Sequence, residues 1–177
     1  MNKTVIIING RGGCGKDTLC DITAEHYRVM NVSSITPVKN IARLAGWNGE
    51  KDPASRKMLA DLKKIFTDYN DLCNSYLVNC LDEFLSAGND SEIMFAHIRE
   101  ASEIAKFKSC VSPLCRVFTL LVKRETSGYS HEALGNTSDD DVESCDYDFV
   151  FVNNAPDIET LANDFTAFLG HVILKEQ

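Results

Sequence analysis

The chain alternates between short runs of apolar residues and longer stretches with the periodicity of amphipathic helices. The runs at 4–8 and 92–98 are nearly continuous, which is typical of strands buried on both faces of a parallel sheet. Strands that alternate with helices predict an α/β fold with a doubly wound parallel sheet of about five strands. The predicted strands are 4–8, 31–34, 92–98, 116–122 and 147–152.

The segments between these strands carry apolar residues at helical spacing. Thr36 is expected to cap the helix of 37–44, and Leu44 to lie on the apolar face of that helix. The apolar stripes of two successive helices, 53–69 and 72–85, are expected to pack in the core or between helices. The remaining predicted helices are 17–30, 101–109 and a closing helix from 158. The length of 177 residues predicts one domain over 1–177.

Four glycines within six positions follow the first predicted strand directly. From Gly10 to Lys16 the sequence reads G-x-x-x-x-G-K, the spacing of a phosphate-binding P-loop. Glycines let successive backbone N–H groups turn toward an oxyanion, and the following helix points its free N–H groups at the same phosphate. A glycine-rich turn without a ligand is the alternative. The predicted phosphate site consists of Gly10, Arg11, Gly12, Gly13, Cys14, Gly15, Lys16, Asp17 and Thr18.

The residue after the lysine is Asp17, where the motif usually has serine or threonine, and Thr18 follows it. A carboxylate can bind Mg²⁺ directly or through water, or it can orient a second substrate. Asp17 and Thr18 are therefore the predicted metal ligands. An acidic residue also suits the first turn of a helix, whatever its function.

Basic residues stand where predicted strands end, and ligands collect at the carboxyl ends of strands in open α/β sheets. Arg99 follows the strand of 92–98, where its guanidinium can hold a phosphate or form a surface ion pair. Lys39 lies in the first turn of a helix, where a cation opposes the helix dipole. This position indicates either a bound anion or simple exposure to solvent.

A second basic pair, Lys123 and Arg124, follows the strand of 116–122. It precedes a polar segment at about 124–146 that contains little to bury. Such a segment suits either a mobile lid or an ordinary solvated loop.

Composition narrows the possible partners. With 44% hydrophobic and 25% charged residues the chain is ordinary for a globular protein, and its net charge of −8 argues against binding nucleic acid. No stretch approaches the ~20 apolar residues of a membrane span. The odd number of seven cysteines, without a C-x-x-C pair, predicts free thiols in the reducing cytoplasm. The oligomeric state is expected to be a monomer or a homodimer.

The whole pattern resembles the P-loop kinases of small metabolites over nearly the full chain, above all deoxynucleoside monophosphate kinases and animal-type phosphomevalonate kinases. Those families share the Gly15-Lys16-Asp17 ending of the loop, and they place an arginine, here Arg99, after the third strand. His97 stands where they have an aspartate. Further similarities are Pro37-Val38-Lys39, Arg56, Lys123-Arg124, Tyr147-Asp148-Phe149-Val150 and Asn153-Asn154.

The resemblance implies a kinase that transfers the γ-phosphoryl group of ATP, with Mg²⁺, to a small phosphorylated acceptor such as a (deoxy)nucleoside monophosphate. Residues 37–88 would form the helical acceptor-binding region. Lys16, Asp17, Arg99 and Arg124 would be catalytic, and Lys39, Arg56 and Arg99 would bind the acceptor. The histidine at position 97 leaves two alternatives open: a non-catalytic nucleotide-binding module, or a kinase of another metabolite such as phosphomevalonate.

Overall fold

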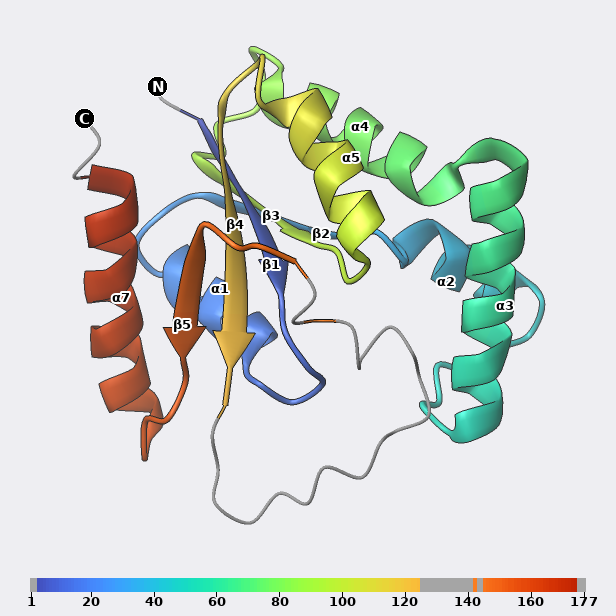
Figure 1. The fold of residues 1–177 in the computed structure, drawn as a ribbon, viewed down its shortest axis with the longest axis horizontal. Helices are drawn as coiled ribbons and strands as arrows, with labels where there is room; N and C mark the ends of the chain where they lie inside the picture. Colours follow the sequence, from blue (N-terminus) through green and yellow to red (C-terminus); the bar gives the residue numbers. More distant parts are fainter. Residues whose placement is uncertain (1–2, 125–141, 143–144, 175–177) are drawn as a thin grey trace.

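The structure, a computed structural model, describes residues 3–124, 142 and 145–174 (Figure 1). The predicted lid segment, 124–146, lies almost entirely outside the described residues. The strands of the described part are β1 (Thr4–Asn9), β2 (Val29–Ser33), β3 (Ile93–His97), β4 (Arg116–Lys123) and β5 (Phe149–Val152). Its helices are α1 (Lys16–Ala24), α2 (Thr36–Leu44), α3 (Pro53–Asn70), α4 (Leu72–Leu85), α5 (Ala101–Val111) and α7 (Ile158–Leu174).

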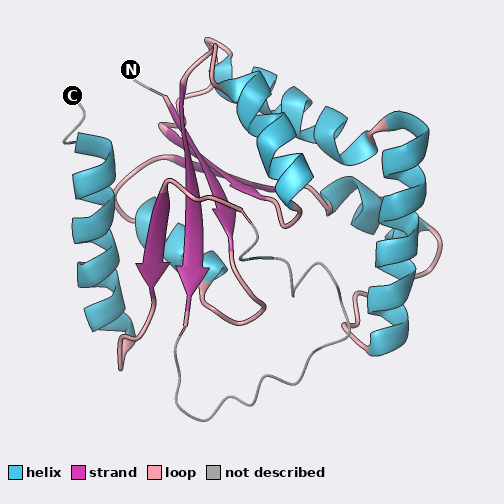
Figure 2. Cartoon of the chain, viewed as in Figure 1, coloured by secondary structure: helices cyan, strands magenta, loops and turns pink. Residues whose placement is uncertain are grey.

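The five strands form one parallel sheet in the order β2-β3-β1-β4-β5, which confirms the predicted fold class (Figure 2). The central strand β1 pairs with β3 as far as Ile8 opposite His97, and with β4 as far as Asn9 opposite Leu121. Because all strands run in the same direction, their carboxyl ends meet at one edge of the sheet.

Helices cover both faces of the sheet (Figure 1). Alternate residues of β1 point to opposite faces, so Ile6 and Ile8 pack with α1 and α7, whereas Val5 and Ile7 pack with α4 and α5. Neither face of β1 meets water. This double burial explains why the strand reads as an unbroken apolar run.

Helices α2 and α3 lie beside the sheet rather than on it (Figure 1). No side chain of α3 is buried, although the helix contacts α2 and α4. Leu44 is 90% exposed, Tyr69 81% and Ile65 58%. The predicted packing of the apolar stripe of 53–69, in the core or between helices, is therefore wrong for Ile65 and Tyr69. Leu44 is exposed as well, although it was expected on the apolar face of its helix.

A cluster of half-buried charges ties α3 to α5. Lys63 on α3 is only 13% exposed, and its Nζ contacts Glu100 and donates to Glu103 Oε2 at 2.8 Å. Burial opposes the charge of both Lys63 and Glu100, but their mutual attraction outweighs it, raising the pKa of Lys63 and lowering that of Glu100. For Glu103 burial dominates and raises the pKa to about 7. The cluster therefore contains a carboxyl group that titrates near neutral pH.

Helix α1 ends at Ala24, well before the predicted end at Met30. Beyond Ala24 the N–H of His26 donates to the carbonyl of Thr23 at 3.1 Å, three residues back, whereas an α-helix bonds four residues back. Val29 and Met30 already belong to β2, where pairing with β3 outweighs their helical spacing.

Helix α2 begins one residue earlier than expected. Ile35 has helical dihedral angles (φ −80°, ψ −6°) and occupies the cap position, and no side chain caps the helix. Thr36 is therefore the first helical residue rather than the cap.

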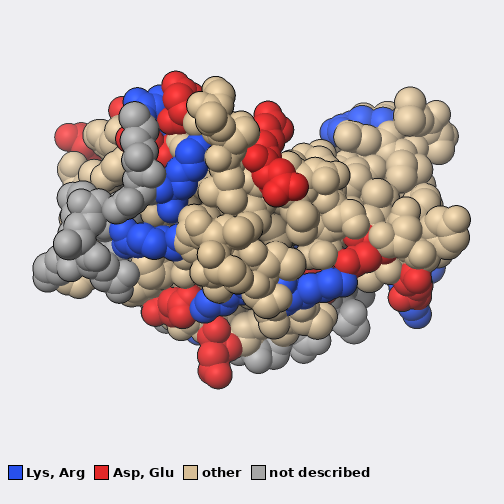
Figure 3. Space-filling view, turned by 90° about the horizontal axis from the view of Figure 1, so that it is seen from above, with Lys and Arg blue, Asp and Glu red and all other residues tan. Residues whose placement is uncertain are grey.

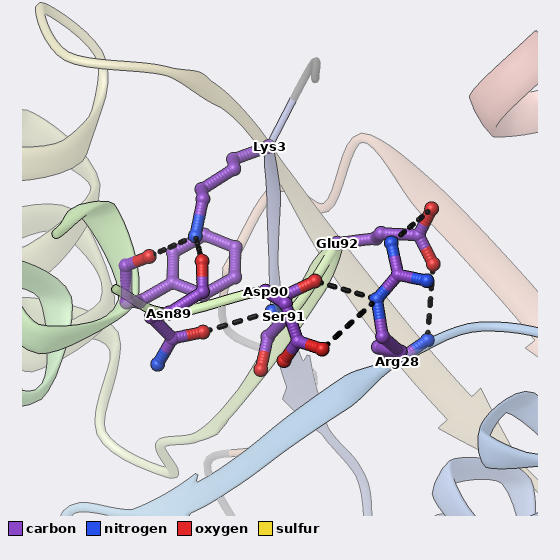
Figure 4. A network of polar contacts seen from close by, with 7 residues as sticks. Lys3, Arg28, Asn89, Asp90, Ser91 and Glu92 are labelled. Carbon is purple, nitrogen blue, oxygen red and sulfur yellow. Dashed lines mark hydrogen bonds and ion pairs between the residues drawn. The ribbon is translucent and has the colours of Figure 1, made fainter. Parts of the chain in front are cut away.

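At the edge where the strands begin, polar contacts hold the chain connections in place (Figure 4). Lys3 Nζ donates to the carbonyl of Asn89 at 2.8 Å, and Arg28 pairs with Asp90 at 3.6 Å and with Glu92 at 3.2 Å. A view from this side shows Lys and Arg interspersed with Asp and Glu (Figure 3). Within the described residues, no helix has the length and apolar character needed to cross a membrane.

Candidate functional site

The glycine-rich loop connects β1 to α1 at the carboxyl edge of the sheet, as its sequence context predicts. Gly10 (φ +150°), Gly13 (φ +79°) and Gly15 (φ +98°) have backbone conformations that other residues rarely adopt. Gly15 is also the cap of α1, so the helix begins directly after it. The free N–H groups of the first helical turn thus follow the loop without a break.

Two of these glycines are required by close contacts with the protein. A Cβ atom on Gly10 would lie 2.4 Å from the carbonyl oxygen of Val122, and one on Gly15 would lie 2.5 Å from Nδ2 of Asn153. Around Gly12 and Gly13 nothing would come within 4 Å. The loop is therefore held against β4 and the end of β5 at its two ends, and its middle is open to a ligand.

Lys16 bends back over the loop. Its Nζ donates to the carbonyl of Gly10 at 2.5 Å and to that of Arg11 at 2.9 Å, and it lies 3.5 Å from Cys14 Sγ. An ammonium group in this place can exchange carbonyl contacts for the oxygens of a phosphate bound at the loop. Cys14 is buried, whereas Arg11 is exposed.

Asp17 and Thr18 occupy the first turn of α1. The side chain of Asp17 is 94% exposed, so its carboxylate is accessible to a cation. Mg²⁺ usually keeps several waters and takes one or two protein oxygens together with the phosphates of a substrate. The exposed carboxylate of Asp17 and the hydroxyl of Thr18 fit that kind of binding. Among the described residues, no group of three or more His, Cys, Asp or Glu side chains forms a dedicated metal cage.

His97 ends β3 beside this turn. Its Nδ1 lies 4.0 Å from Asp17 Oδ1, and its Nε2 lies 3.6 Å from the thiol of Cys20. Burial lowers the pKa of His97, the cations Lys16 and Arg99 lower it further, and Asp17 opposes them. The ring is therefore neutral at pH 7. Burial also raises the pKa of the Cys20 thiol, which stays protonated.

Two of the predicted acceptor residues, Lys39 and Arg99, come together around His97 and Asp17. The pKa of Lys39 is lowered by burial and by the nearby cations Lys51, Arg43 and Arg99, whereas Asp17 raises it. Several positive charges thus gather in a protein whose net charge is −8. This is the local concentration of cations that binding an anion requires.

The sequence analysis did not identify Lys51 or Arg43. Lys51 lies in the irregular segment between α2 and α3, and Arg43 in the last turn of α2, so neither belongs to a recognisable motif. Arg56 is exposed on α3, and its Nε donates to the carbonyl of Lys51 at 2.9 Å. It is therefore connected to the cation cluster through Lys51 rather than through Lys39 or Arg99.

The second basic pair lies at the end of β4. Lys123 is half-buried, and its carbonyl accepts a hydrogen bond from the N–H of Asn153 at 2.7 Å. Arg124 is exposed directly after the strand. The catalytic role expected of Arg124 remains a prediction, because the segment that follows it lies outside the described residues.

Two buried asparagines support the loop. Asn153 donates from Nδ2 to the carbonyl of Cys14 at 2.9 Å, and Asn9 accepts at Oδ1 from the N–H of Gly10 at 2.8 Å. Asn153 was named in the sequence analysis only as part of a weak similarity to the kinase families, and Asn9 belonged to no motif. All seven cysteines are free thiols, and Cys14 and Cys20 lie in the core next to this site.

No protein-family model matches the sequence, and no curated protein is significantly similar to it. Solved structures do match it over nearly the full length of both chains. TT1252 from Thermus thermophilus has a TM-score of 0.51 at 16% identity, covering 97% of this chain and 99% of its own. An unliganded sugar kinase from Janibacter sp. HTCC2649 has a TM-score of 0.53 at 14% identity, covering 96% of this chain and 95% of its own.

A third similar structure is the tunicamycin resistance protein of Deinococcus radiodurans, with a TM-score of 0.51 at 16% identity and 96% of each chain covered. At such identities the likeness shows the fold alone. The chain has an α/β fold similar to that of the Janibacter sugar kinase, with a five-stranded parallel sheet between two layers of helices.

Proposed function

We propose that the protein is a phosphotransferase that transfers the γ-phosphoryl group of ATP to a small phosphorylated acceptor, with a (deoxy)nucleoside monophosphate as the acceptor class. The observation that carries this proposal is the gathering of two kinds of phosphate-binding group near Asp17 and His97. The glycine loop with Lys16 is one kind, and the cations Lys39 and Arg99 are the other; the charges of all three residues act on the His97 ring. The structural likeness to a sugar kinase supports the same class of reaction.

The donor phosphates would bind in the loop. A Cβ atom on Gly12 or Gly13 would meet nothing within 4 Å, so this part of the loop is open, and the ammonium group of Lys16 already contacts the loop carbonyls. Such a site binds the tail of a nucleoside triphosphate through backbone dipoles and one point charge. Asp17 and Thr18 would hold Mg²⁺, which when bound neutralises charge on the β- and γ-phosphate oxygens.

Lys39 and Arg99 would bind the acceptor phosphate and direct one of its oxygens at the γ-phosphorus. In the transfer, a bond forms between that oxygen and the γ-phosphorus, and the bond to the β–γ bridging oxygen breaks, so that ADP leaves. The protein contributes positioning and positive charge rather than covalent chemistry. Because the His97 ring is neutral, it adds no negative charge beside the phosphate groups, which a carboxylate at this position would do.

One observation favours a second candidate. His97 is a poor ligand for Mg²⁺, and it stands where the kinase families that the sequence resembles have an aspartate. The alternative is therefore a module that binds nucleotide without turnover. A kinase of another phosphorylated metabolite, such as phosphomevalonate, would use the same cation cluster for its acceptor.

A coupled ADP-release assay separates these proposals. The purified chain is given Mg-ATP and a panel of nucleoside monophosphates, deoxynucleoside monophosphates and phosphomevalonate. Turnover with one nucleotide acceptor, abolished by Lys16→Ala in a protein that still unfolds cooperatively, is the expected result. Unchanged turnover in Lys16→Ala rules out the assignment of the loop. ATP binding without turnover on any acceptor favours the non-catalytic module.

A further inference from the structure

Asn9, the last residue of β1, connects parts of the chain that are far apart in sequence. It is 1% exposed, and its side chain makes three hydrogen bonds. Oδ1 accepts from the N–H of Gly10 at 2.8 Å, and Nδ2 donates to the carbonyl of Arg99 at 2.9 Å and to the hydroxyl of Tyr147 at 2.7 Å. Both N–H bonds of the amide are therefore used.

These partners belong to the two halves of the proposed site. Gly10 is the first residue of the donor loop, and Arg99 carries the guanidinium proposed to bind the acceptor. Tyr147 in turn donates to the carbonyl of Val142 at 2.7 Å. One buried amide thus touches the backbone of the donor loop and the backbone of the acceptor arginine.

The sheet itself does not make this connection. The pairing of β1 with β3 ends at Ile8 opposite His97, two residues before Arg99, whereas the pairing with β4 continues to Asn9. Beyond His97 the Asn9 side chain takes the place of the missing backbone pairing. A short side chain with one acceptor and two donors is needed here, which asparagine provides and aspartate or leucine does not.

We propose that Asn9 is a positioning residue that fixes the acceptor arginine relative to the donor-phosphate loop. The expected effect of Asn9 on catalysis rests on the proposed function, but its effect on the structure of the two segments does not. Phosphoryl transfer depends on the distance between the two phosphates, and a displacement of about 1 Å can lower a rate by roughly 100-fold.

Hydrogen exchange of the ligand-free protein tests the structural part. In Asn9→Ala, amides in both 10–16 and 98–104 are expected to exchange about 5- to 30-fold faster, because each segment loses one buried hydrogen bond. Asn9→Asp keeps the oxygen for Gly10 but lacks the donor for Arg99, so faster exchange is expected mainly in 98–104. Phe168→Leu changes ring contacts of α7 with Phe149, Phe151 and Phe165 and lies in neither segment, so it controls for general loss of stability and should raise exchange in both segments less than Asn9→Ala does.

Kinetics test the functional part. Asn9→Ala is expected to lower kcat by about 10- to 100-fold and to raise the KM of the acceptor, while the Kd of ATP changes less than about 3-fold. Tyr147→Phe keeps the bonds to Gly10 and Arg99, so its kcat is expected to stay within about 3-fold of wild type.

Exchange that rises in 10–16 but not in 98–104 of Asn9→Ala would overturn the proposal, as would an unchanged kcat. If the wild-type chain binds no ATP, the proposed function fails separately, and the exchange measurement still decides whether Asn9 joins the two segments.

Discussion

Gly15→Ala tests whether the loop is shaped by the protein around it. Gly15 has φ +98°, and a Cβ atom there would lie 2.5 Å from Nδ2 of Asn153. Asn153 is 4% exposed, and the same Nδ2 donates to the carbonyl of Cys14. The new methyl group cannot be accommodated unless Asn153 moves and gives up this hydrogen bond.

The expected loss of stability has two parts. A left-handed backbone conformation is unfavourable for alanine by about 1–2 kcal/mol. Displacing Asn153 leaves a buried carbonyl without its partner, which is unfavourable by about 1–3 kcal/mol. The sum is about 2–5 kcal/mol, or a decrease in Tm of roughly 4–20 °C for a chain of this size.

Urea unfolding of four variants measures the two parts separately. Gly13→Ala has a positive φ of +79° but meets nothing within 4 Å, so it should show only the backbone part, about 1–2 kcal/mol. In an Asn153→Ala background, Gly15→Ala should likewise lower the free energy of unfolding only by the backbone part. The two changes at positions 15 and 153 should therefore be less than additive by about 1–3 kcal/mol.

Two results would refute this reasoning. If Gly15→Ala and Gly13→Ala lose the same stability, Asn153 does not restrict the loop. If the losses of Gly15→Ala and Asn153→Ala simply add, the two side chains do not compete for one space.

Two further predictions concern the helices around the acceptor side. Between about pH 4.5 and 7 the folded state holds the Glu103 proton more tightly than the unfolded state does, because the pKa of this carboxyl rises from 4.5 to about 7 on folding. The ionisation of Glu103 therefore lowers the stability of the folded state as pH rises through that window. In Glu103→Gln the urea midpoint should not show this decrease with pH. A pH dependence equal to that of wild type would contradict the assignment. Arg99→Met, which removes a charge-assisted contact, should raise the acceptor KM by about 10- to 100-fold and leave the Kd of ATP within about 3-fold; an unchanged KM would exclude Arg99 from the acceptor site.

The sheet could be predicted from the sequence because its strands are buried on both faces and therefore read as apolar runs. The glycine loop could be predicted because its glycines and Lys16 lie in one short stretch directly after a strand, although the contacts with Val122 and Asn153 could not. Helix ends were less predictable. Val29 and Met30 fit a helical pattern, but pairing with β3 places them in β2.

The parts of the site that sequence analysis missed depend on contacts between distant segments. Asn9 meets Arg99 across 90 positions, and Asn153 meets Cys14 across 139. Nothing in the residues near Asn9 indicates that its side chain would extend the sheet pairing. The predictions for Leu44 and Tyr69 were wrong for another reason. Both residues fit an apolar helical pattern, but their helices lie beside the sheet and leave these side chains exposed.

The central claim is that the glycine loop and Lys16 bind the phosphates of a nucleoside triphosphate, and a thermal-shift titration with Mg-ATP tests it most directly. At a ligand concentration 100 times Kd, binding stabilises the folded state by about 2.7 kcal/mol. For a chain of this size the wild-type Tm should then rise by roughly 5–11 °C, and Lys16→Ala should lose most of that rise. If neither ATP nor GTP at millimolar concentration with magnesium raises the wild-type Tm, the account is contradicted.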